Sequence, residues 1–283
     1  SNYMKALPIT IIESKTKSVF NFKEIVRYKD LLYYMVLRDV TVMYKQTVLG
    51  FFWAILNPLF QIVVFSVIFG KVAAISTGVS GLPYPLFSCL AVIPWTYFSS
   101  TFTASSNSLI TTASIFTKVY FPRMIIPLVP IFSKLVDFFI SLIILIGVML
   151  YYQYTPGSNW ILFPIPLLII IITSAGLGFW LSSLALQYRD FRFAIGFILP
   201  LLMYVAPVAY PAAKVHQQLG DTAYHLYAIY PMVGGIEGFR SSFLQNAPFP
   251  WELVLISGTV AIFLFITGAL YFKKMEKHFA DVA

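Results

Sequence analysis

The first long pattern in the chain is a charged amphipathic segment that runs into an apolar one. At 3.6 residues per turn, residues 23–45 divide into a mostly charged stripe and an opposite apolar stripe. The first holds Lys23, Arg27, Asp30, Tyr34, Arg38, Thr41 and Lys45, and the second holds Ile25, Leu32, Val36 and Met43. Residues 51–69 then carry no charged side chain and are long enough to cross a bilayer as a helix. This order predicts an amphipathic helix in the headgroup layer joined to a spanning helix, although the first helix of a soluble domain would show the same stripes.

Five further apolar runs, each about as long as a membrane-spanning helix, follow along the chain. Together with the first run they predict an all-α polytopic membrane protein with six transmembrane helices. The expected spans are residues 49–69, 84–107, 125–152, 161–186, 193–210 and 252–272.

The composition favours membrane spans over the helices of a soluble domain. Of the 283 residues, 59% are hydrophobic and 11% are charged, whereas soluble domains carry roughly 25% charged residues. Most of the protein surface must therefore face something other than water. A net charge of +8 can indicate a nucleic-acid partner in a soluble protein, but here the positions of the charges are more informative, and we expect no nucleic-acid partner.

Lys and Arg are distributed unequally between the two sides of the expected membrane domain. If the N-terminus is cytoplasmic, most of them fall in the inner segments, and only Lys71, Lys214 and Arg240 fall in the outer ones. Cytoplasmic loops of membrane proteins carry such an excess of Lys and Arg. We therefore expect a multi-pass protein surrounded by membrane lipids, with both termini in the cytoplasm.

The sequence lacks the motifs of nucleotide-binding and metal-dependent enzymes. No segment matches the phosphate-binding P-loop pattern, so the chain cannot cradle nucleotide phosphates in that way. Cys89 is the single cysteine, and no group of Cys and His residues has the spacing of a metal site. We expect a transport subunit that is not an enzyme and binds no cofactor or metal of its own.

Lys134 and Asp137 are the charged pair within the expected spans. They are three residues apart on the third span, so their side chains can meet and lower the cost of burying either charge. A structural pair near the inner leaflet and an ion or proton site both fit this spacing, and the structural pair is favoured because paired charges so often serve structure.

Polar and aromatic residues share faces of three expected spans. These residues are Trp53, Asn57, Phe60 and Gln61 on the first, Thr96, Tyr97, Ser99, Ser100, Thr103 and Asn107 on the second, and Phe193, Phe197 and Tyr204 on the fifth. Aromatic rings offer apolar contact to the C–H faces of sugars, while hydroxyl and amide groups exchange hydrogen bonds with the sugar hydroxyls. Many weak contacts of this kind suit a translocation path. Helix–helix packing is the alternative, above all for the Ser and Thr residues.

Two inner loops and one outer segment have a character of their own. Residues 109–123 are polar at first and then amphipathic, which predicts a short cytoplasmic helix that presents Ile115, Phe116 and Tyr120 to a partner. The second inner loop, residues 187–192, is compact and charged. On the outer side, residues 211–250 are not fully polar, and their stretch 224–244 is moderately apolar and broken by Pro and Gly, which suits two short helices at the outer interface.

Four segments resemble the ABC-2 permease family, and within it the membrane subunit of O-antigen polysaccharide exporters, with teichoic-acid and capsule exporters as near relatives. They read RDVTVMYKQTVLGFFWAILNPLFQ at residues 38–61, LQYRDFR at 186–192, YPMVGGIEGFRSSFL at 230–244 and YFKKMEKHFAD at 271–281. The likeness covers nearly the whole chain from about Lys23, with the order of the segments kept.

The resemblance implies a homodimer in a bacterial inner membrane, with two separate ATP-binding subunits docked beneath it. ATP and magnesium are held by those subunits, and a lipid-linked polysaccharide passes between the two permease copies. The implied segments are an N-terminal cytoplasmic tail (1–22), an amphipathic interface helix (23–47), a transmembrane domain (48–272) that includes a coupling helix near 109–123 and outer gate helices near 212–248, and a cytoplasmic C-terminal tail (273–283).

Residue roles carried over by position fall into three groups. The channel-lining candidates are Trp53, Asn57, Phe60, Gln61, Tyr97, Ser100, Phe197 and Tyr204. The candidates for coupling to the ATPase are Ile115, Phe116, Lys118, Tyr120, Arg123, Arg38, Arg189 and Asp190, and those for the outer gate are Glu237 and Arg240.

Two rival functions remain open from the sequence. An exporter of the same class could carry teichoic acid, capsule, a drug or a lipid. An ion-coupled secondary transporter would use Lys134 and Asp137 and need no ATPase, but ionisable groups within the spans are otherwise sparse.

Overall fold

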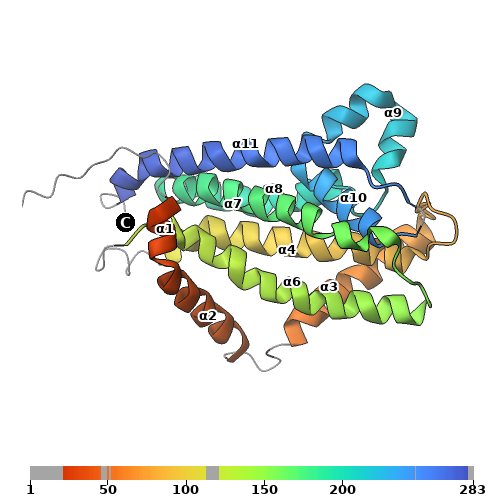
Figure 1. The fold of residues 1–283 in the computed structure, drawn as a ribbon, viewed down its shortest axis with the longest axis horizontal. Coiled ribbons are helices and arrows are strands. Elements are labelled where there is room, and N and C mark those ends of the chain that lie inside the picture. The colour runs from red at the N-terminus through yellow and green to blue at the C-terminus, as the bar shows by residue number, and fades with distance from the viewer. Residues whose placement is uncertain (1–21, 46–49, 51, 113–120, 246, 280–283) are drawn as a thin grey trace, which may run out of the picture.

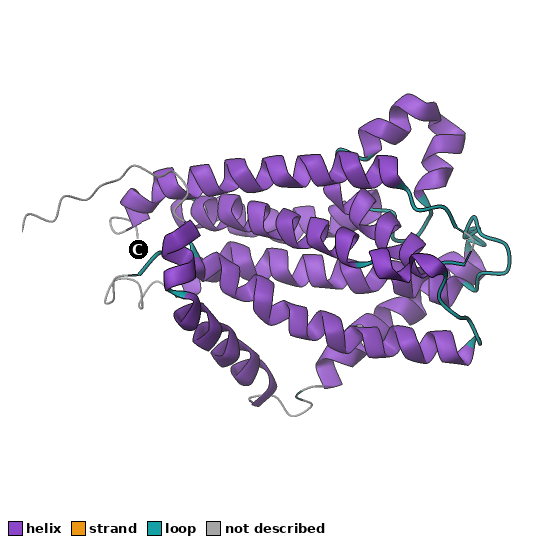
Figure 2. Ribbon diagram, viewed as in Figure 1, coloured by secondary structure: helices purple, strands orange, loops and turns teal. Residues whose placement is uncertain are grey.

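The computed structural model describes residues 22–45, 50, 52–112, 121–245 and 247–279. Within these ranges the chain is helical throughout, with turns and short loops between the helices and no strand (Figure 2). The expected all-α class is therefore confirmed for the described part. The coupling candidates Ile115, Phe116, Lys118 and Tyr120 lie outside the described residues.

The helices lie mostly lengthwise in one elongated bundle, with α2 slanting away from it at one end and α9 projecting at the other (Figure 1). Their bounds are α1 Phe22–Arg27, α2 Lys29–Lys45, α3 Phe52–Phe65, η1 Ser66–Val72, α4 Tyr84–Thr111, α6 Ile125–Tyr151, η2 Ser158–Leu162, α7 Pro164–Gln187, α8 Arg189–Val205, α9 Ala212–Tyr227, α10 Pro231–Phe243, α11 Trp251–Met275 and η3 Glu276–His278.

Helix α4 forms the centre of the bundle. It packs against α3, α6, α7, α8 and α10, and the run from Leu86 to Trp95 is buried all round. Pro85 in its first turn suits a helix start, because proline has no N–H to leave unpaired there. The face of α4 that stays partly open lies in its second half, where Ser99, Ser100 and Thr103 replace the large apolar residues.

Helices α7 and α11 pack at very short range because glycines face one another across their contact. A side-chain carbon added to Gly268 would collide with the backbone carbonyl of Gly176, and one added to Gly176 would lie 2.6 Å from the backbone nitrogen of Phe265. Small residues allow membrane helices to approach this closely. The two helices lie side by side along the bundle (Figure 1).

Four helical segments of the described chain are long and apolar enough to cross a membrane: Phe52–Val72, Ile125–Tyr151, Ser158–Gln187 and Trp251–Met275. Two of the six expected spans, α4 and α8, do not meet both the length and the hydropathy of these four segments. Helix α4 has the length, but its Ser and Thr residues lower its hydropathy. Helix α8 has only 17 residues and starts with the charged sequence RDFR. The fold is thus that of a multi-pass membrane protein, and the count of six stays a prediction.

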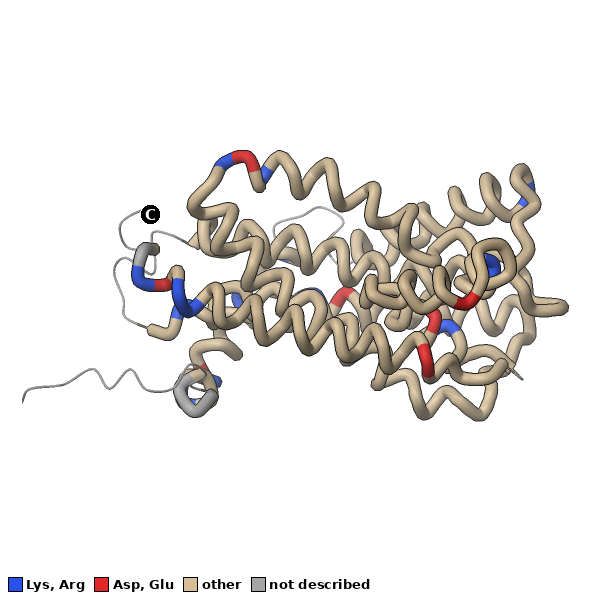
Figure 3. Tube along the Cα trace, turned by 90° about the horizontal axis from the view of Figure 1, so that it is seen from above, with Lys and Arg blue, Asp and Glu red and all other residues tan. Residues whose placement is uncertain are grey.

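The amphipathic N-terminal segment forms two helices rather than one continuous helix, with a turn at Tyr28 between α1 and α2. Helix α2 packs on α6, where Met35 is buried against Ile125 and Val129. Leu32 and Val36, both from the expected apolar stripe, join this contact, and the helix therefore places the expected side inward. Charged residues lie mostly toward the two ends of the molecule, and few lie along its middle (Figure 3).

Candidate functional site

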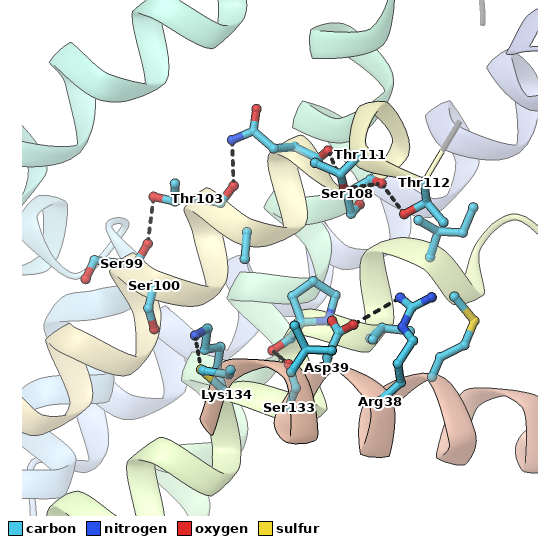
Figure 4. A pocket seen from close by; sticks show the side chains of 18 of the residues that line it. Arg38, Asp39, Ser99, Ser100, Thr103, Ser108, Thr111, Thr112, Ser133 and Lys134 are labelled. Atoms are coloured by element: carbon cyan, nitrogen blue, oxygen red, sulfur yellow. Dashed lines mark hydrogen bonds and ion pairs between the residues drawn. The ribbon is translucent and has the colours of Figure 1, made fainter. Parts of the chain in front are cut away.

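A polar cavity of about 960 Å³ lies between α2, α4 and α6, and α3 and α8 contribute to its edge (Figure 4). Side chains of α2 and α4 face one another across it, with Lys134 of α6 between them. Its polar lining consists of Arg38, Asp39, Asn57, Gln61, Thr96, Ser99, Ser100, Thr103, Asn107, Ser108, Thr111, Thr112, Ser133 and Lys134.

Most hydroxyl and amide groups of α4 at this cavity donate to carbonyls of their own helix, whereas the buried hydroxyl of Thr96 has no partner in the structure. Ser100 Oγ donates to the carbonyl of Tyr97 at 3.1 Å, Thr103 Oγ1 to that of Ser99 at 3.0 Å, and Asn107 Nδ2 to that of Thr103 at 2.9 Å. Each donor is thereby satisfied inside the apolar bundle, while the oxygen keeps its capacity to accept from the cavity side. The result is a row of neutral acceptors suited to a ligand that is rich in hydroxyl groups.

The amides of α3 stand at the edge of the same cavity. Gln61 Nε2 donates to Asn57 Oδ1 at 3.4 Å, which is a weak contact between exposed groups. Both amides therefore keep donors and acceptors available to the cavity. The structure brings these two channel candidates together with Ser100, and their role in a channel stays a prediction.

The predicted ion pair between Lys134 and Asp137 is present, with Lys134 Nζ 3.3 Å from Asp137 Oδ2. Both side chains also contact the end of α2, since Lys134 lies 3.0 Å from the sulfur of Met43 and the hydroxyl of Tyr44 donates to Asp137 Oδ1. Burial, together with this hydrogen bond to a carboxylate, raises the pKa of Tyr44. The pair therefore fastens the end of α2 to α6, as a structural pair would.

A smaller cavity of about 310 Å³ adjoins this pair, and Trp53, Tyr97 and Ser100 are among its lining residues. Trp53 is exposed, whereas Tyr97 is only 2% exposed. The Tyr97 ring packs edge-on against Phe138, and its hydroxyl donates to the carbonyl of Ile131 at 3.1 Å. Most of Tyr97 thus serves the contact between α4 and α6.

The other aromatic candidates point away from both cavities. Phe60 on α3 and Phe197 and Tyr204 on α8 are largely exposed on the surface of the single chain. One chain therefore does not bring all eight candidates to one place. Their exposure leaves aromatic rings on the surfaces of α3 and α8, two helices that both pack on α4.

Sequence reasoning missed several polar cavity residues, namely Asp39, Ser108, Thr111, Thr112 and Ser133. The signal for Thr111 was present, because it extends the stripe of Thr103 and Asn107 by one more turn. Asp39 could not be found in this way, since nothing in its local sequence indicates that α2 would face α4.

The described coupling candidates lie at separate places. Arg38 lines the large cavity and forms an ion pair with Asp39 at 3.0 Å. Arg189 and Asp190 are exposed in the first turn of α8. Arg123, the last residue of the coupling loop (residues 109–123), donates from Nη1 to the backbone carbonyl of Glu276 at 3.0 Å.

The two outer-gate candidates form a buried ion pair on α10. Arg240 is 2% exposed, and its Nη1 lies 2.6 Å from Glu237 Oε1. Its Nη2 donates to the carbonyl of Pro207 at 2.6 Å, and the guanidinium lies 3.9 Å from the centroid of the Phe87 ring. Glu237 Oε1 also accepts from the backbone N–H of Ala212 at 2.7 Å. The pair thus joins α10 to α4 and to the turn that leads from α8 into α9.

A protein-family model described as ABC-2 type transporter matches residues 30–244. The chain belongs to the ABC-2 type transporter family. It is therefore a membrane transport subunit, and the resemblance seen in the sequence is confirmed.

Curated relatives of this ABC-2 chain carry one common description. A protein of Myxococcus xanthus named O-antigen export system permease protein RfbA is 24% identical over 260 residues, which cover 92% of this chain and 97% of the relative. Two proteins of Klebsiella pneumoniae with the same name are 27% and 28% identical over 256 residues, covering 89% of this chain and 95% of each relative.

Proposed function

We propose that this ABC-2 chain is the permease subunit of an ATP-driven exporter that moves a lipid-linked, O-antigen-like polysaccharide out of the cytoplasm across the bacterial inner membrane. The observation that carries the proposal is the cavity beside α4, which is lined by a row of hydroxyl and amide groups, together with exposed aromatic rings on α3 and α8. Sugars match such a lining, because they bring hydroxyl groups and apolar C–H faces together. The names of the three curated relatives support the same cargo.

A closed path needs a second copy of the chain. In a single copy the aromatic candidates Phe60, Phe197 and Tyr204 are exposed, and the cavity is open at its edge. A homodimer that joins the α3 and α8 surfaces would cover these aromatic rings and close the polar face of α4 into a channel. The glycan would then slide past many weak contacts without a deep binding site. Six spans per copy, with both termini in the cytoplasm, complete this arrangement.

The energy comes from two separate ATP-binding subunits, which hold ATP and magnesium. Binding and hydrolysis of ATP move the coupling loop and the amphipathic helices α1 and α2. The contact of α2 with Lys134 and Asp137 passes the motion to α6 beside the cavity. The permease itself carries out no covalent chemistry.

Two alternative functions differ from this proposal, one in its cargo and the other in its energy source. A drug or lipid exporter of the same class should tolerate loss of the hydroxyl and amide lining, because a hydrophobic cargo makes no hydrogen bonds with it. An ion-coupled transporter should work without any ATPase. The contacts of Asp137 with Lys134 and Tyr44 favour a structural role for the pair instead.

The test is export of a lipid-linked glycan in vesicles that hold the chain and its ATP-binding partner. We expect Asn57→Leu combined with Gln61→Leu to slow glycan export while transport of a hydrophobic dye, if any, is unchanged. A loss of dye transport with glycan export intact would contradict the proposed cargo.

A further inference from the structure

The C-terminal end of the described chain lies against both ends of the coupling loop. Helix α11 continues through the short helix η3 to Phe279, which is 1% exposed. Phe279 belongs to a buried cluster with Leu109 in the last turn of α4 and Phe121 just before α6. These two residues bracket residues 110–120 of the loop. A side chain near the end of the described chain therefore shares one buried cluster with the segment that enters the loop and the segment that leaves it.

Within this cluster, Phe279 contacts an aromatic ring of α11. Its ring lies 5.2 Å from that of Phe272 at an interplanar angle of 76°, and Phe272 in turn lies 5.6 Å from Phe179 of α7. Edge-to-face pairs of this kind favour one orientation of the rings. The cluster thus connects the loop ends to the rigid contact between α7 and α11.

Glu276 makes polar contacts with Arg123, at the C-terminal end of the coupling loop. Its Oε1 accepts from the backbone N–H of Arg123 at 3.3 Å, and its backbone carbonyl accepts from Arg123 Nη1 at 3.0 Å. Glu276 Oε2 also accepts from Lys273 at 2.8 Å, so the carboxylate is oriented by its own helix. Arg123 is thereby fixed at two points where the chain leaves the loop and turns into α6.

We propose that residues 276–279 form a clamp. Its positioning residues, Glu276 and Phe279, hold the two ends of the coupling loop in place, so that an ATP-binding subunit that moves the loop also moves the attached helices. This inference rests on the proposed function of the loop. The clamp itself binds no nucleotide and no cargo. Without it the loop ends could shift when the ATPase pushes, and the ATP would be hydrolysed without moving the helices beside the cavity.

The experiment measures glycan exported per ATP hydrolysed, in vesicles with the full chain and its ATP-binding partner. We expect Glu276→Ala and Phe279→Ala to lower this ratio about two- to thirtyfold, the range typical of residues that carry coupling between sites. Glu276→Gln should keep most of the ratio, because the amide oxygen still accepts from Arg123. Lys274→Ala changes an exposed residue that precedes the clamp and serves as the matched control.

A second measurement reports on the loop itself and does not depend on export. Cys89 is fully buried, so maleimide labelling of a Ser114→Cys variant beyond that of the parent chain reports on the introduced thiol. We expect the ATP-binding partner to protect this thiol, and Phe279→Ala to reduce the protection at an unchanged protein level. Phe279→Leu, which keeps an apolar side chain in the cluster, tests the same point if the alanine variant does not accumulate.

The outcomes separate the clamp from the function on which it rests. If Phe116→Ala with Tyr120→Ala lowers the ratio but the Glu276 and Phe279 variants do not, the clamp is refuted and the coupling loop stands. If the Phe116 and Tyr120 variants leave the ratio unchanged, the proposed role of the loop itself fails. A lower thermal midpoint with an unchanged ratio would mark residues 276–279 as structural only, and it would overturn the proposal.

Discussion

Arg240 and Glu237 are one helical turn apart on α10 and form an ion pair with Nη1 and Oε1 2.6 Å apart, almost completely shielded from solvent. Arg240 also donates to the carbonyl of Pro207, and Glu237 accepts from the N–H of Ala212. These two backbone groups lie on either side of the turn before α9. This end of the fold is therefore held by charges, although its surroundings are apolar. Breaking such a pair leaves the remaining charge without a partner.

The first prediction concerns this pair. Glu237→Ala should lower the free energy of unfolding by about 3–5 kcal/mol, because Arg240 would stay buried without its counter-charge. Thermal unfolding in detergent measures the effect. Glu252→Ala is the control, since this carboxylate is exposed and should change the midpoint little. Equal midpoints for the two variants would contradict a stabilising role of the buried pair.

The second prediction concerns the contact between α7 and α11. Gly176→Ala should destabilise the fold by about 1–3 kcal/mol, since the added methyl group meets the backbone of α11 and the helices must move apart. Gly147→Ala on α6 is the matched control, because nothing lies within 4 Å of the added carbon. If both variants unfold at the wild-type temperature, the two helices are not packed as described.

The third prediction concerns the cavity. Ser100 on α4 borders both cavities, so Ser100→Trp should obstruct the path. We expect glycan export to fall about tenfold, which corresponds to a rise of about 1.4 kcal/mol in the activation free energy of transport. ATP hydrolysis by the partner should continue. Thr259→Trp places the same side chain on the exposed surface of α11 and should export normally. Full export by the Ser100 variant would place the path elsewhere.

The fourth prediction concerns the charged pair on α6. Asp137→Asn should keep ATP-driven export within about twofold, because the amide oxygen can still accept from Tyr44. Export should also be insensitive to a protonophore at constant ATP. Asp137→Leu removes the acceptor and should loosen α2, which limited proteolysis of the N-terminal segment can detect. Abolished export in the asparagine variant, together with sensitivity to the protonophore, would favour ion coupling.

Local patterns in the sequence predicted much of this fold. The helical class followed from apolar runs, and the pairing of Lys134 with Asp137 followed from their spacing of three residues. The polar stripe of α4 was visible at helical periodicity, and the structure places most of it at the cavity. These features depend on neighbours along one helix, which a sequence displays directly.

Contacts between distant segments could not be read in this way. The hydrogen bond from Tyr44 to Asp137 spans 93 residues, and the one from Arg123 to Glu276 spans 153. Neither partner has a local pattern that points to the other. The hydropathy of α4 also misleads, since its hydroxyl residues suggest a weak span although the helix lies at the centre of the bundle. Which apolar faces meet is decided by the packing of all the helices together.

The most direct measurement of the central claim is glycan transport by the purified chain in vesicles, with and without its ATP-binding partner. We expect export of a lipid-linked polysaccharide only when both proteins and ATP with magnesium are present, and no export with a partner that cannot hydrolyse ATP. Equal export by the chain alone, or none by the complete system, would contradict the account.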